Sequence, residues 1–381
     1  MNILYFDNNA TTRVLPEVME AMLPWFCEQY GNPSSSHPFG ENAKQALIRS
    51  RAAVAGFLNA SPGEIIFTSG ATESSHIAIL GALAIKPQRK RIVTSAVEHS
   101  ATLRLLTHLA TDGIEIIQVP VTTSGMLDMA ALRAAVTEDT ALVTLMHANN
   151  ETGIIFPVAE AAAIAKAQGA LFHTDAAQTA GKITLDCKQL DCDLLSFSGH
   201  KLHAPKGTGV LFVRKGIALP PMFYGHQERN RRGGTENLAS IIGLAVACRM
   251  AQDYLAQADK RGALRDLLEA QLQERLPFIR INGYGPRVPN TSSICFAGLH
   301  GEELLHRMGQ AGVMASQGSA CTAGGTEPSH VLLAMGLDRD EALSTVRFSL
   351  SRETTEADID LAVITVTEII KAMTGGLPAA A

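Results

Sequence analysis

Short runs rich in Val, Ile, Leu and Phe recur between residues 64 and 214, and longer helix-like stretches separate several of them. Apolar runs of this length, bounded by Gly, Pro or polar residues, are typical of strands that are buried on both faces of a sheet. Seven strands are therefore predicted, in EIIFTSG (64–70), RIVTSAVE (91–98), IEIIQVPV (114–121), ALVTLMHANN (141–150), ALFHTDAAQ (170–178), DLLSFSGH (193–200) and GTGVLFVR (207–214).

Helical patterns lie between these runs, in ESSHIAILGALA (73–84) and PVAEAAAIAKAQG (157–169). The second pattern ends in Gly169, and glycine is the residue expected just past the end of a helix. Strands that alternate with helices favour a largely parallel sheet covered by helices on both faces. The predicted fold class is therefore α/β.

The pattern changes after about residue 250. A long polar helix is predicted from about Tyr254 to Arg275, and strand-like and helical pieces follow it to the C-terminus. A chain of 381 residues also exceeds the length of about 250 to 300 residues at which one core stops growing. We predict a large domain over residues 13–250 and a smaller α+β domain over residues 251–381, to which residues 1–12 are assigned.

Polar residues gather where the predicted strands end. In sheets of this class, ligands bind at the carboxyl ends of the strands. One pocket is therefore predicted, lined by five groups: Ser69 to Thr72, Glu98 and His99, Asn149 to Glu151, Asp175 to Gln178, and Ser198 to Lys201.

Three residues of these groups suit a cofactor that carries an aldehyde and a pyridine ring. A lysine in a partly buried pocket, such as Lys201, can form a Schiff base with an aldehyde, although a surface loop lysine is the alternative. Asp175 ends a buried strand, where a carboxylate is costly unless paired, and it suits the protonated pyridine nitrogen of pyridoxal 5'-phosphate (PLP). A helix cap is the other interpretation of Asp175. Gln178 could reach the phenolic oxygen of the ring or be a surface amide.

Other strand-end residues suit a phosphate group. Ala71 and Thr72 follow a strand and open a helix, whose free N–H groups and hydroxyl make an anion site, although an ordinary N-cap explains Thr72 equally well. Ser198 and His200 add further donors, and no Walker or Rossmann glycine pattern points to a nucleotide instead. His99 could stack on a flat cofactor and move protons, or be a structural histidine.

Two further residues lie outside the predicted sheet. Cys321 is in ASQGSACTAGGTEPSH, a stretch of small residues without apolar periodicity. A thiol on such a loop can approach a substrate, take up a sulfur atom and deliver it, and an incidental loop cysteine is the alternative. Arg347 interrupts an alternating strand pattern in STVRFSLSR, so we expect it to pair with a carboxylate, either of an amino-acid substrate or of a structural salt bridge.

Composition narrows the class of protein. The net charge is -5, the pI is near 6.2, and no long run of Lys or Arg occurs, so neither nucleic acid nor an anionic membrane is expected as a partner. Six cysteines without a Cys-x-x-Cys pair predict reduced thiols, and no metal site is expected. The start of the chain lacks a leader pattern and no apolar run reaches roughly 18 residues, so a cytoplasmic protein is expected.

Seven strings in order and spacing resemble the group I cysteine desulfurases of the NifS/IscS class. The resemblance covers nearly the whole chain, from YFDNNATT to the C-terminal helix, and GHQERNRRGGTEN with the continuous LHAPKG leans toward the NifS branch. The strings are FTSGATES, HANNETG, HTDAAQ, SGHKLHAPKG, GHQERNRRGGTEN, GSACT and VRFSLSR.

This resemblance implies a class V aminotransferase of PLP fold type I that acts as a homodimer. It implies conversion of L-cysteine to L-alanine, with the sulfur passing to an enzyme persulfide and then to an iron–sulfur scaffold protein or another acceptor. The implied roles are Lys201 as the lysine that binds the cofactor aldehyde, Asp175 at the pyridine nitrogen, Gln178 at the phenolic oxygen, His99 stacked on the ring as acid/base, Ala71, Thr72, Ser198 and His200 at the phosphate, Thr235 donated to the phosphate across the dimer interface, Asn149 and Arg347 at the substrate carboxylate, and Cys321 as the persulfide-forming nucleophile.

Three alternatives differ in what they require. A selenocysteine lyase would share the PLP pocket and would be recognised by its relative rates on selenocysteine and cysteine. Another class V PLP enzyme would need neither Cys321 nor its loop. A non-enzymatic sulfur carrier would need no cofactor.

Overall fold

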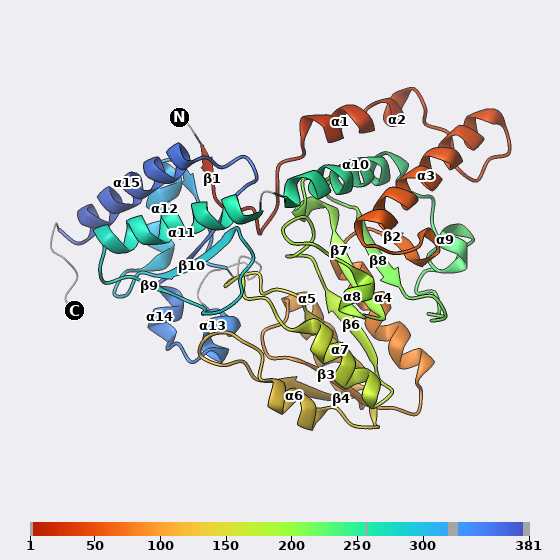
Figure 1. Cartoon of the computed structure of the whole chain (residues 1–381), viewed down its shortest axis with the longest axis horizontal. Coiled ribbons are helices and arrows are strands. Elements are labelled where there is room, and N and C mark those ends of the chain that lie inside the picture. Colours follow the sequence, from red (N-terminus) through yellow and green to blue (C-terminus); the bar gives the residue numbers. More distant parts are fainter. Residues whose placement is uncertain (1–2, 257, 319–326, 376–381) are drawn as a thin grey trace.

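A computed structural model describes residues 3–256, 258–318 and 327–375. One region is built on the large sheet, and a second region, which includes the C-terminal helix, lies at the other end of the molecule (Figure 1). The large sheet has seven strands in the order β2-β8-β7-β6-β5-β3-β4. They are the seven predicted strands: β2 (Ile65–Thr68), β3 (Arg91–Ser95), β4 (Glu115–Val119), β5 (Thr140–Met146), β6 (Leu171–Asp175), β7 (Leu194–Ser198) and β8 (Gly209–Val213).

The sheet is mainly parallel, which confirms the predicted fold class. Only β8 runs against its neighbours, because it pairs antiparallel with both β7 and β2. Two antiparallel steps restore the direction, so β2 runs the same way as β7. The carboxyl ends of β2, β3, β5, β6 and β7 therefore all lie at one edge of the sheet.

Helices cover both faces of this sheet. On one face, α4 (Ala71–Ile85) and α5 (Ser100–Thr111) form two small apolar clusters with the strands. On the other face, α3 (Pro38–Phe57), α7 (Val158–Ala167) and α10 (Leu238–Leu255) contribute to the largest core. The remaining helices of this region are α1 (Pro16–Met22), α2 (Pro24–Cys27), α6 (Met129–Ala135), α8 (Cys187–Leu190) and α9 (Gln227–Asn230).

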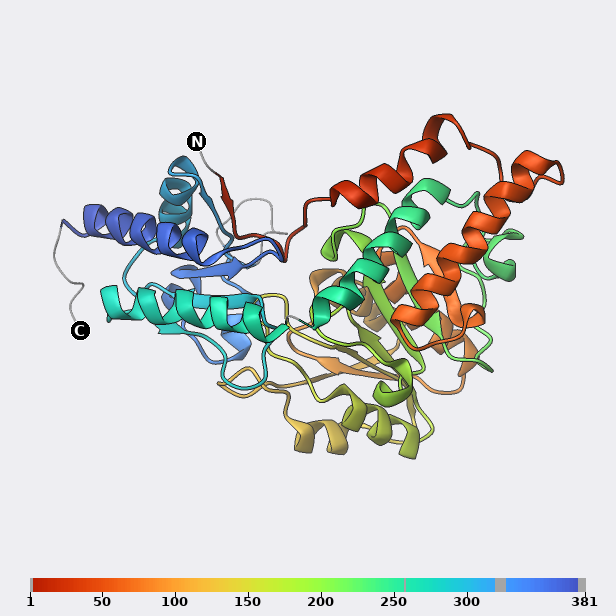
Figure 2. The ribbon, with the colours of Figure 1, turned by 45° about the horizontal axis from the view of Figure 1, so that its top comes forward.

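Among the described residues, helix α10 is long and apolar enough to cross a membrane. It packs along α3 and α1, and both views of the ribbon show it against these helices (Figure 2). More than half of it, 56%, is buried inside the protein, as expected for a core helix.

The second region has its own apolar core. Phe6, from the start of the chain, packs in it with Phe296 and Phe348. Strand β1 (Leu4–Tyr5) pairs in parallel with β11 (Val313–Met314), so the N-terminus belongs to this region. Its other elements are β9 (Arg280–Ile281), β10 (Thr291–Cys295) and β12 (Thr345–Ser349), in the order β12-β10-β9, and α11 (Ala258–Arg275), α12 (Gly301–Gln310) and α15 (Glu356–Met373). The short helices α13 (His330–Ala334) and α14 (Arg339–Leu343) follow β11 in the sequence, but their buried residues Val331, Leu332 and Ala342 belong to the largest core.

The structure corrects the long polar helix that was predicted from Tyr254. Tyr254 lies in the last turn of α10, and the polar helix α11 begins at Ala258. The guanidinium groups of Arg261 and Arg352 lie 4.1 and 4.2 Å from the centre of the Tyr254 ring, so this tyrosine is at a junction between the two helices. The predicted domain boundaries themselves stay a prediction.

A glycine on β8 allows the loop after β2 to lie close to the sheet. A Cβ added to Gly209 would be 2.5 Å from the Cα of Gly70, which is closer than real Cβ contacts allow. Gly70 directly precedes α4, so the absence of a side chain at Gly209 places the N-terminus of α4 at the edge where the strands end.

Candidate active site

A cavity of about 530 Å³ opens at the edge where the five strands end. Most of its wall comes from the loops that follow these strands, as expected for an α/β sheet. Eight of the residues selected from the sequence line it: Ala71, Thr72, His99, Asp175, Gln178, Ser198, His200 and Lys201.

Lys201 closes a short 3-10 turn that directly follows β7. Its amine donates hydrogen bonds to the backbone carbonyl oxygens of Asn9, at 2.5 Å, and of Ala10, at 2.9 Å. Ala10 and Thr11 also line the cavity, so the N-terminal segment forms one of its walls. Sequence reasoning missed these residues, although NNATT is a polar stretch without helical or strand periodicity and could have been marked for that reason.

Asp175 ends β6 and is shielded from bulk solvent, with part of its surface open to the cavity. One carboxylate oxygen accepts a hydrogen bond of 2.8 Å from the backbone N–H of Ala177. Burial raises the pKa of the Asp175 carboxyl, and the Ala177 bond and the charges of His99 and Lys201 offset only part of this rise. A cationic group of a ligand beside Asp175 would stabilise its ionised form.

The part of the cavity wall at the start of α4 suits an anion. Helix α4 has 15 residues and begins at Ala71, so its first N–H groups face the turn Ser69–Gly70. A Cβ on Gly70 would lie 3.5 Å from Ser198 Oγ, so the glycine leaves space beside this hydroxyl group. Ser69 and Ser75, which sequence reasoning did not select individually as ligands, also line the cavity.

His200 also lines the cavity. Its Nδ1 is 3.1 Å from Thr11 Oγ1. Burial, together with the charges of Lys201 and Lys206, lowers the pKa of His200 to about 4. The imidazole is therefore neutral at physiological pH and can donate only one N–H.

His99 is the N-cap of α5. Its Nδ1 accepts a hydrogen bond of 3.2 Å from the backbone N–H of Ala101, and this fixes the neutral ring as the tautomer with its hydrogen on Nε2. Burial lowers the pKa of His99, and Lys201 and His330 lower it further, while Asp175 raises it. His99 therefore holds a proton at Nε2 without a net charge.

Glu98 precedes His99 and fixes its position. One Glu98 carboxyl oxygen accepts hydrogen bonds from Ser95 Oγ, at 2.6 Å, and from the backbone N–H of Met146, at 2.9 Å. These bonds tie the end of β3 to the end of β5. Burial raises the pKa of Glu98 to about 8, and the nearby charge of Asp175 raises it as well.

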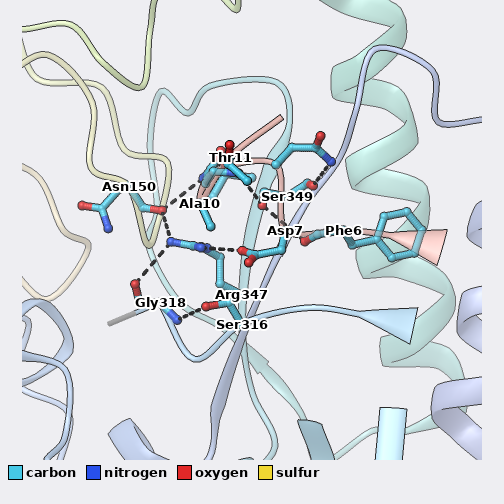
Figure 3. Close-up of polar contacts among 12 residues, drawn as sticks. Phe6, Asp7, Ala10, Thr11, Asn150, Ser316, Gly318, Arg347 and Ser349 are labelled. Carbon is cyan, nitrogen blue, oxygen red and sulfur yellow. Dashed lines mark hydrogen bonds and ion pairs between the residues drawn. The ribbon is translucent and has the colours of Figure 1, made fainter. Parts of the chain in front are cut away.

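Arg347 lies beside the cavity and not in its described lining. Its side chain pairs with Asp7, with 2.7 Å between Nη2 and Oδ1, and its Nη1 donates to the backbone oxygens of Asn150, at 3.1 Å, and of Gly318, at 3.3 Å (Figure 3). This is the structural salt bridge that the sequence left open. Among the described residues its Nε has no hydrogen-bond partner. A role in binding a substrate carboxylate stays a prediction.

Asn149 is almost fully buried, and its side chain is engaged by the local turn. Its Oδ1 accepts from the backbone N–H groups of Glu151 and Thr152, and its Nδ2 donates to the backbone oxygen of Val97. The next residue, Asn150, lines the cavity instead. The predicted contact of Asn149 with a substrate carboxylate stays a prediction.

Two other predicted residues are not placed in this cavity. Thr235 is exposed and lines a neighbouring hollow of about 150 Å³, together with Arg232 and Glu236. Cys321 lies outside the described residues, so its role stays a prediction.

Comparison with known proteins identifies the family. Residues 4–362 match the family model of the class V aminotransferases. The chain is 47% identical over 371 residues to the cysteine desulfurase NifS of Azotobacter vinelandii, an alignment that covers 96% of this chain and 92% of that protein. The chain belongs to the cysteine desulfurases of the class V aminotransferase family.

Solved structures agree with this assignment. A NifS-like protein superposes with a TM-score of 0.91 at 37% identity, covering 97% of this chain and 100% of that one. SspA, whose structure was solved in complex with cysteine, superposes with a TM-score of 0.81 at 33% identity and covers 92% of this chain and 100% of its own. These likenesses give the fold as PLP fold type I.

The cavity of this cysteine desulfurase family member fits the cofactor of the family. PLP has a phosphate, an aldehyde and a pyridine nitrogen. The cavity offers a helix N-terminus with the Ser198 hydroxyl, the amine of Lys201, and the buried carboxylate of Asp175. The three residue groups that could hold PLP therefore line the same cavity.

We expect Glu98 to make the stability of the protein fall as pH rises. Its ordinary pKa is 4.5 and its pKa in the folded protein is about 8. Between these two values the folded state keeps a proton that the unfolded chain releases. The contribution of Glu98 to the stability is therefore fully present below pH 4.5 and is lost as the pH rises through 8. Glu98→Gln removes this titration. Between about pH 5 and pH 8, the free energy of unfolding of the variant should rise relative to the parent by at least about 1.4 kcal/mol, the equivalent of one pKa unit.

Denaturant unfolding across this pH range measures the difference. Glu138→Gln, at an exposed position in the loop before β5, is the matched control and should leave the difference constant. A constant difference for Glu98→Gln as well would contradict the buried, protonated carboxyl.

Proposed function

We propose that this chain is a PLP-dependent cysteine desulfurase that converts L-cysteine to L-alanine and transfers the sulfur to Cys321. The observation that carries the proposal is the single cavity in which the amine of Lys201, the carboxylate of Asp175 and the N-terminus of α4 meet, in a chain of the cysteine desulfurase family. Burial makes the Asp175 carboxylate costly to ionise, and a ligand that uses this carboxylate and the Lys201 amine in the same cavity would offset the cost.

Different residues of the cavity wall would hold the different groups of PLP. Lys201 would bind the aldehyde and Asp175 the pyridine nitrogen. Gln178 would face the phenolic oxygen and His99 the flat ring. The phosphate would lie at the first turn of α4, beside Ser198 and His200. When bound, PLP supplies an electron sink that makes the substrate α-proton acidic.

The side chains of the chain supply the proton transfers. After the substrate has taken the place of Lys201 at the cofactor aldehyde, the lysine amine would act as a base. The carbonyl oxygens of Asn9 and Ala10 would hold it close to the ligand. His99 holds a proton at Nε2 and can donate it to a developing negative charge. The neutral form of His99 follows from its burial in the cavity wall, which lowers its pKa.

The sulfur step requires a thiolate. We propose that the Cys321 thiolate forms an S–S bond with the substrate sulfur while the carbon–sulfur bond breaks. The electron pair of the broken bond stays with carbon, which takes up protons to become alanine. No external oxidant is needed, because the sulfur atom transfers at the oxidation level of a persulfide.

The purified, PLP-loaded protein should release alanine from L-cysteine and gain a persulfide on Cys321. Lys201→Ala should lower alanine release by at least about a hundredfold, because general base and binding group are lost together. Cys321→Ala should lose the persulfide and most of the sulfide release. Mass spectrometry of the intact protein and its peptides, with alanine quantified in the same sample, measures both.

Cys27→Ala is the matched control, since Cys27 is an exposed thiol on α2 far along the chain from Cys321. It should leave both products unchanged. Full sulfide release by Cys321→Ala would contradict the transfer step, and faster turnover of selenocysteine than of cysteine would favour a selenocysteine lyase.

We further propose that the protein acts as a homodimer. Three large apolar side chains of α2 and its neighbouring loops, Leu23, Phe26 and Tyr30, are 57%, 57% and 71% exposed, which is typical of an interface. Thr235 is exposed and does not line the cavity of its own chain, which suits a hydrogen bond from Thr235 to the phosphate in a partner subunit.

The mass in solution tests this. Light scattering should give about twice the chain mass of 40.5 kDa. A mass of one chain at micromolar concentration would contradict the dimer.

We also propose that the protein works in the cytoplasm and that its sulfur supplies iron–sulfur cluster assembly, through a scaffold protein or another acceptor. The relatives are named cysteine desulfurases, and the sulfur that such an enzyme removes from cysteine needs an acceptor. Cluster formation on an apo-scaffold supplied with iron and L-cysteine, and fractionation of cells, would measure the two.

A further inference from the structure

Lys182 lies buried behind the cavity wall, four residues after Gln178 in the turns that follow β6. Only 5% of its surface is exposed. Between the two residues, Gly181 has a φ of +76° and packs against Leu202, where an added Cβ would lie 2.9 Å from the Leu202 Cβ. This left-handed glycine turns the chain after Gln178 and lets the lysine side chain return beneath it.

The amine of Lys182 binds two amide oxygens. It donates to Gln178 Oε1 and to Asn9 Oδ1, each at 2.7 Å. Burial and the charges of Lys201, Arg347 and Arg261 lower the pKa of Lys182 well below its usual value. Both hydrogen bonds need only N–H donors, so the charged and the neutral amine can make them.

These contacts determine which way the Gln178 amide points. Its Nε2 donates at 3.1 Å to the backbone oxygen of Asn9, which can only accept, while its Oε1 accepts from Lys182. A flipped amide would place its oxygen against the backbone oxygen of Asn9, so that buried end would lose its hydrogen bond whatever the charge of Lys182. The end at Lys182 would lose its bond as well when the amine is charged, because an ammonium group can only donate.

The fixed orientation matters for the cavity. The Asn9 oxygen that accepts from Gln178 Nε2 also accepts from Lys201 Nζ, so the NH2 end of the amide lies on the side of Lys201. This NH2 group has two hydrogens and Asn9 takes one. The other remains to be donated to a ligand oxygen.

We propose that Lys182 is a positioning residue that locks the Gln178 amide with its N–H group, and not its carbonyl oxygen, presented to the ligand. The inference rests on the proposed function, because the ligand oxygen is then the anionic phenolic oxygen of PLP. A donor there stabilises the anion, whereas a carbonyl oxygen would repel it. Lys182 itself does not touch the cofactor.

The pH at which the absorption band of the bound cofactor changes reports this donor. Losing the donor makes the phenolic oxygen hold its proton more tightly. Lys182→Met should therefore raise the midpoint by about one pH unit, a tenfold change in proton affinity. Lys182→Gln keeps an N–H donor at the end of the side chain, so its midpoint should lie closer to that of the parent.

A double-mutant cycle separates this role from a direct effect of the lysine charge on Lys201. In a Gln178→Leu background, Lys182→Met should shift the midpoint by less than about 0.3 pH unit, because there is no amide left to orient. Lys188→Met is the matched control, as Lys188 is an exposed lysine on α8 that binds Asn59 Oδ1 at 3.2 Å, and it should not move the midpoint.

Each outcome has a distinct meaning. A parent protein that shows no absorption band of bound PLP would overturn the proposed function. A band that responds to pH in the same way in the parent and in Lys182→Met would overturn only the role of Lys182. A shift that persists in full without Gln178 would assign the effect to charge and also overturn it. If Lys182→Met does not fold, Lys182→Leu, which also lacks an N–H donor, completes the same cycle with and without Gln178.

Discussion

The shared direction of five strands is the constraint on which the site depends. Because β2, β3, β5, β6 and β7 all end at one edge, loops that are far apart in the sequence deliver their polar residues to one cavity. The reversed strand β8 supplies none of the predicted site residues, but it helps to shape the cavity. It carries Gly209, whose missing side chain lets the start of α4 approach the sheet.

Asn9 connects this cavity to the second region. Its backbone N–H donates to Ser349 Oγ, at 2.9 Å, and its side chain to Thr291 Oγ1, at 2.8 Å, both in strands of the second region. Its backbone oxygen accepts from Lys201 and Gln178. One residue near the start of the chain thus holds Lys201 and the strands β10 and β12 in a common frame, and the Arg347–Asp7 pair strengthens the same joint.

Much of this could be predicted from the sequence, because strand ends show locally. Apolar runs bounded by Gly and polar residues marked all seven strands, and the rule for parallel sheets then placed eight residues in one cavity. The orientation of β8 could not be predicted, since an apolar run has no direction. Nor could the start of α11, because the polar residues around Tyr254 continue without a break.

Contacts across the chain were beyond the sequence as well. Asp7 and Arg347 are 340 residues apart, and an alternating pattern indicates only that the arginine needs a carboxylate. Lys182 follows a glycine and resembles a surface lysine after a turn. Its burial becomes visible only in the folded structure, where Asn9 packs against it. The sequence also does not show that Asn149 is held by its local turn while Asn150 lines the cavity.

The central claim is that Lys201 is the lysine that binds the cofactor aldehyde. Three lysines make this testable, because Lys201 and Lys206 line the cavity and Lys182 lies behind it. The protein would be loaded with PLP, reduced with borohydride and digested, and the modified peptide mapped by mass spectrometry. The account predicts the label on Lys201 alone, and a label on Lys206 or Lys182, or no label in a folded protein, would contradict it.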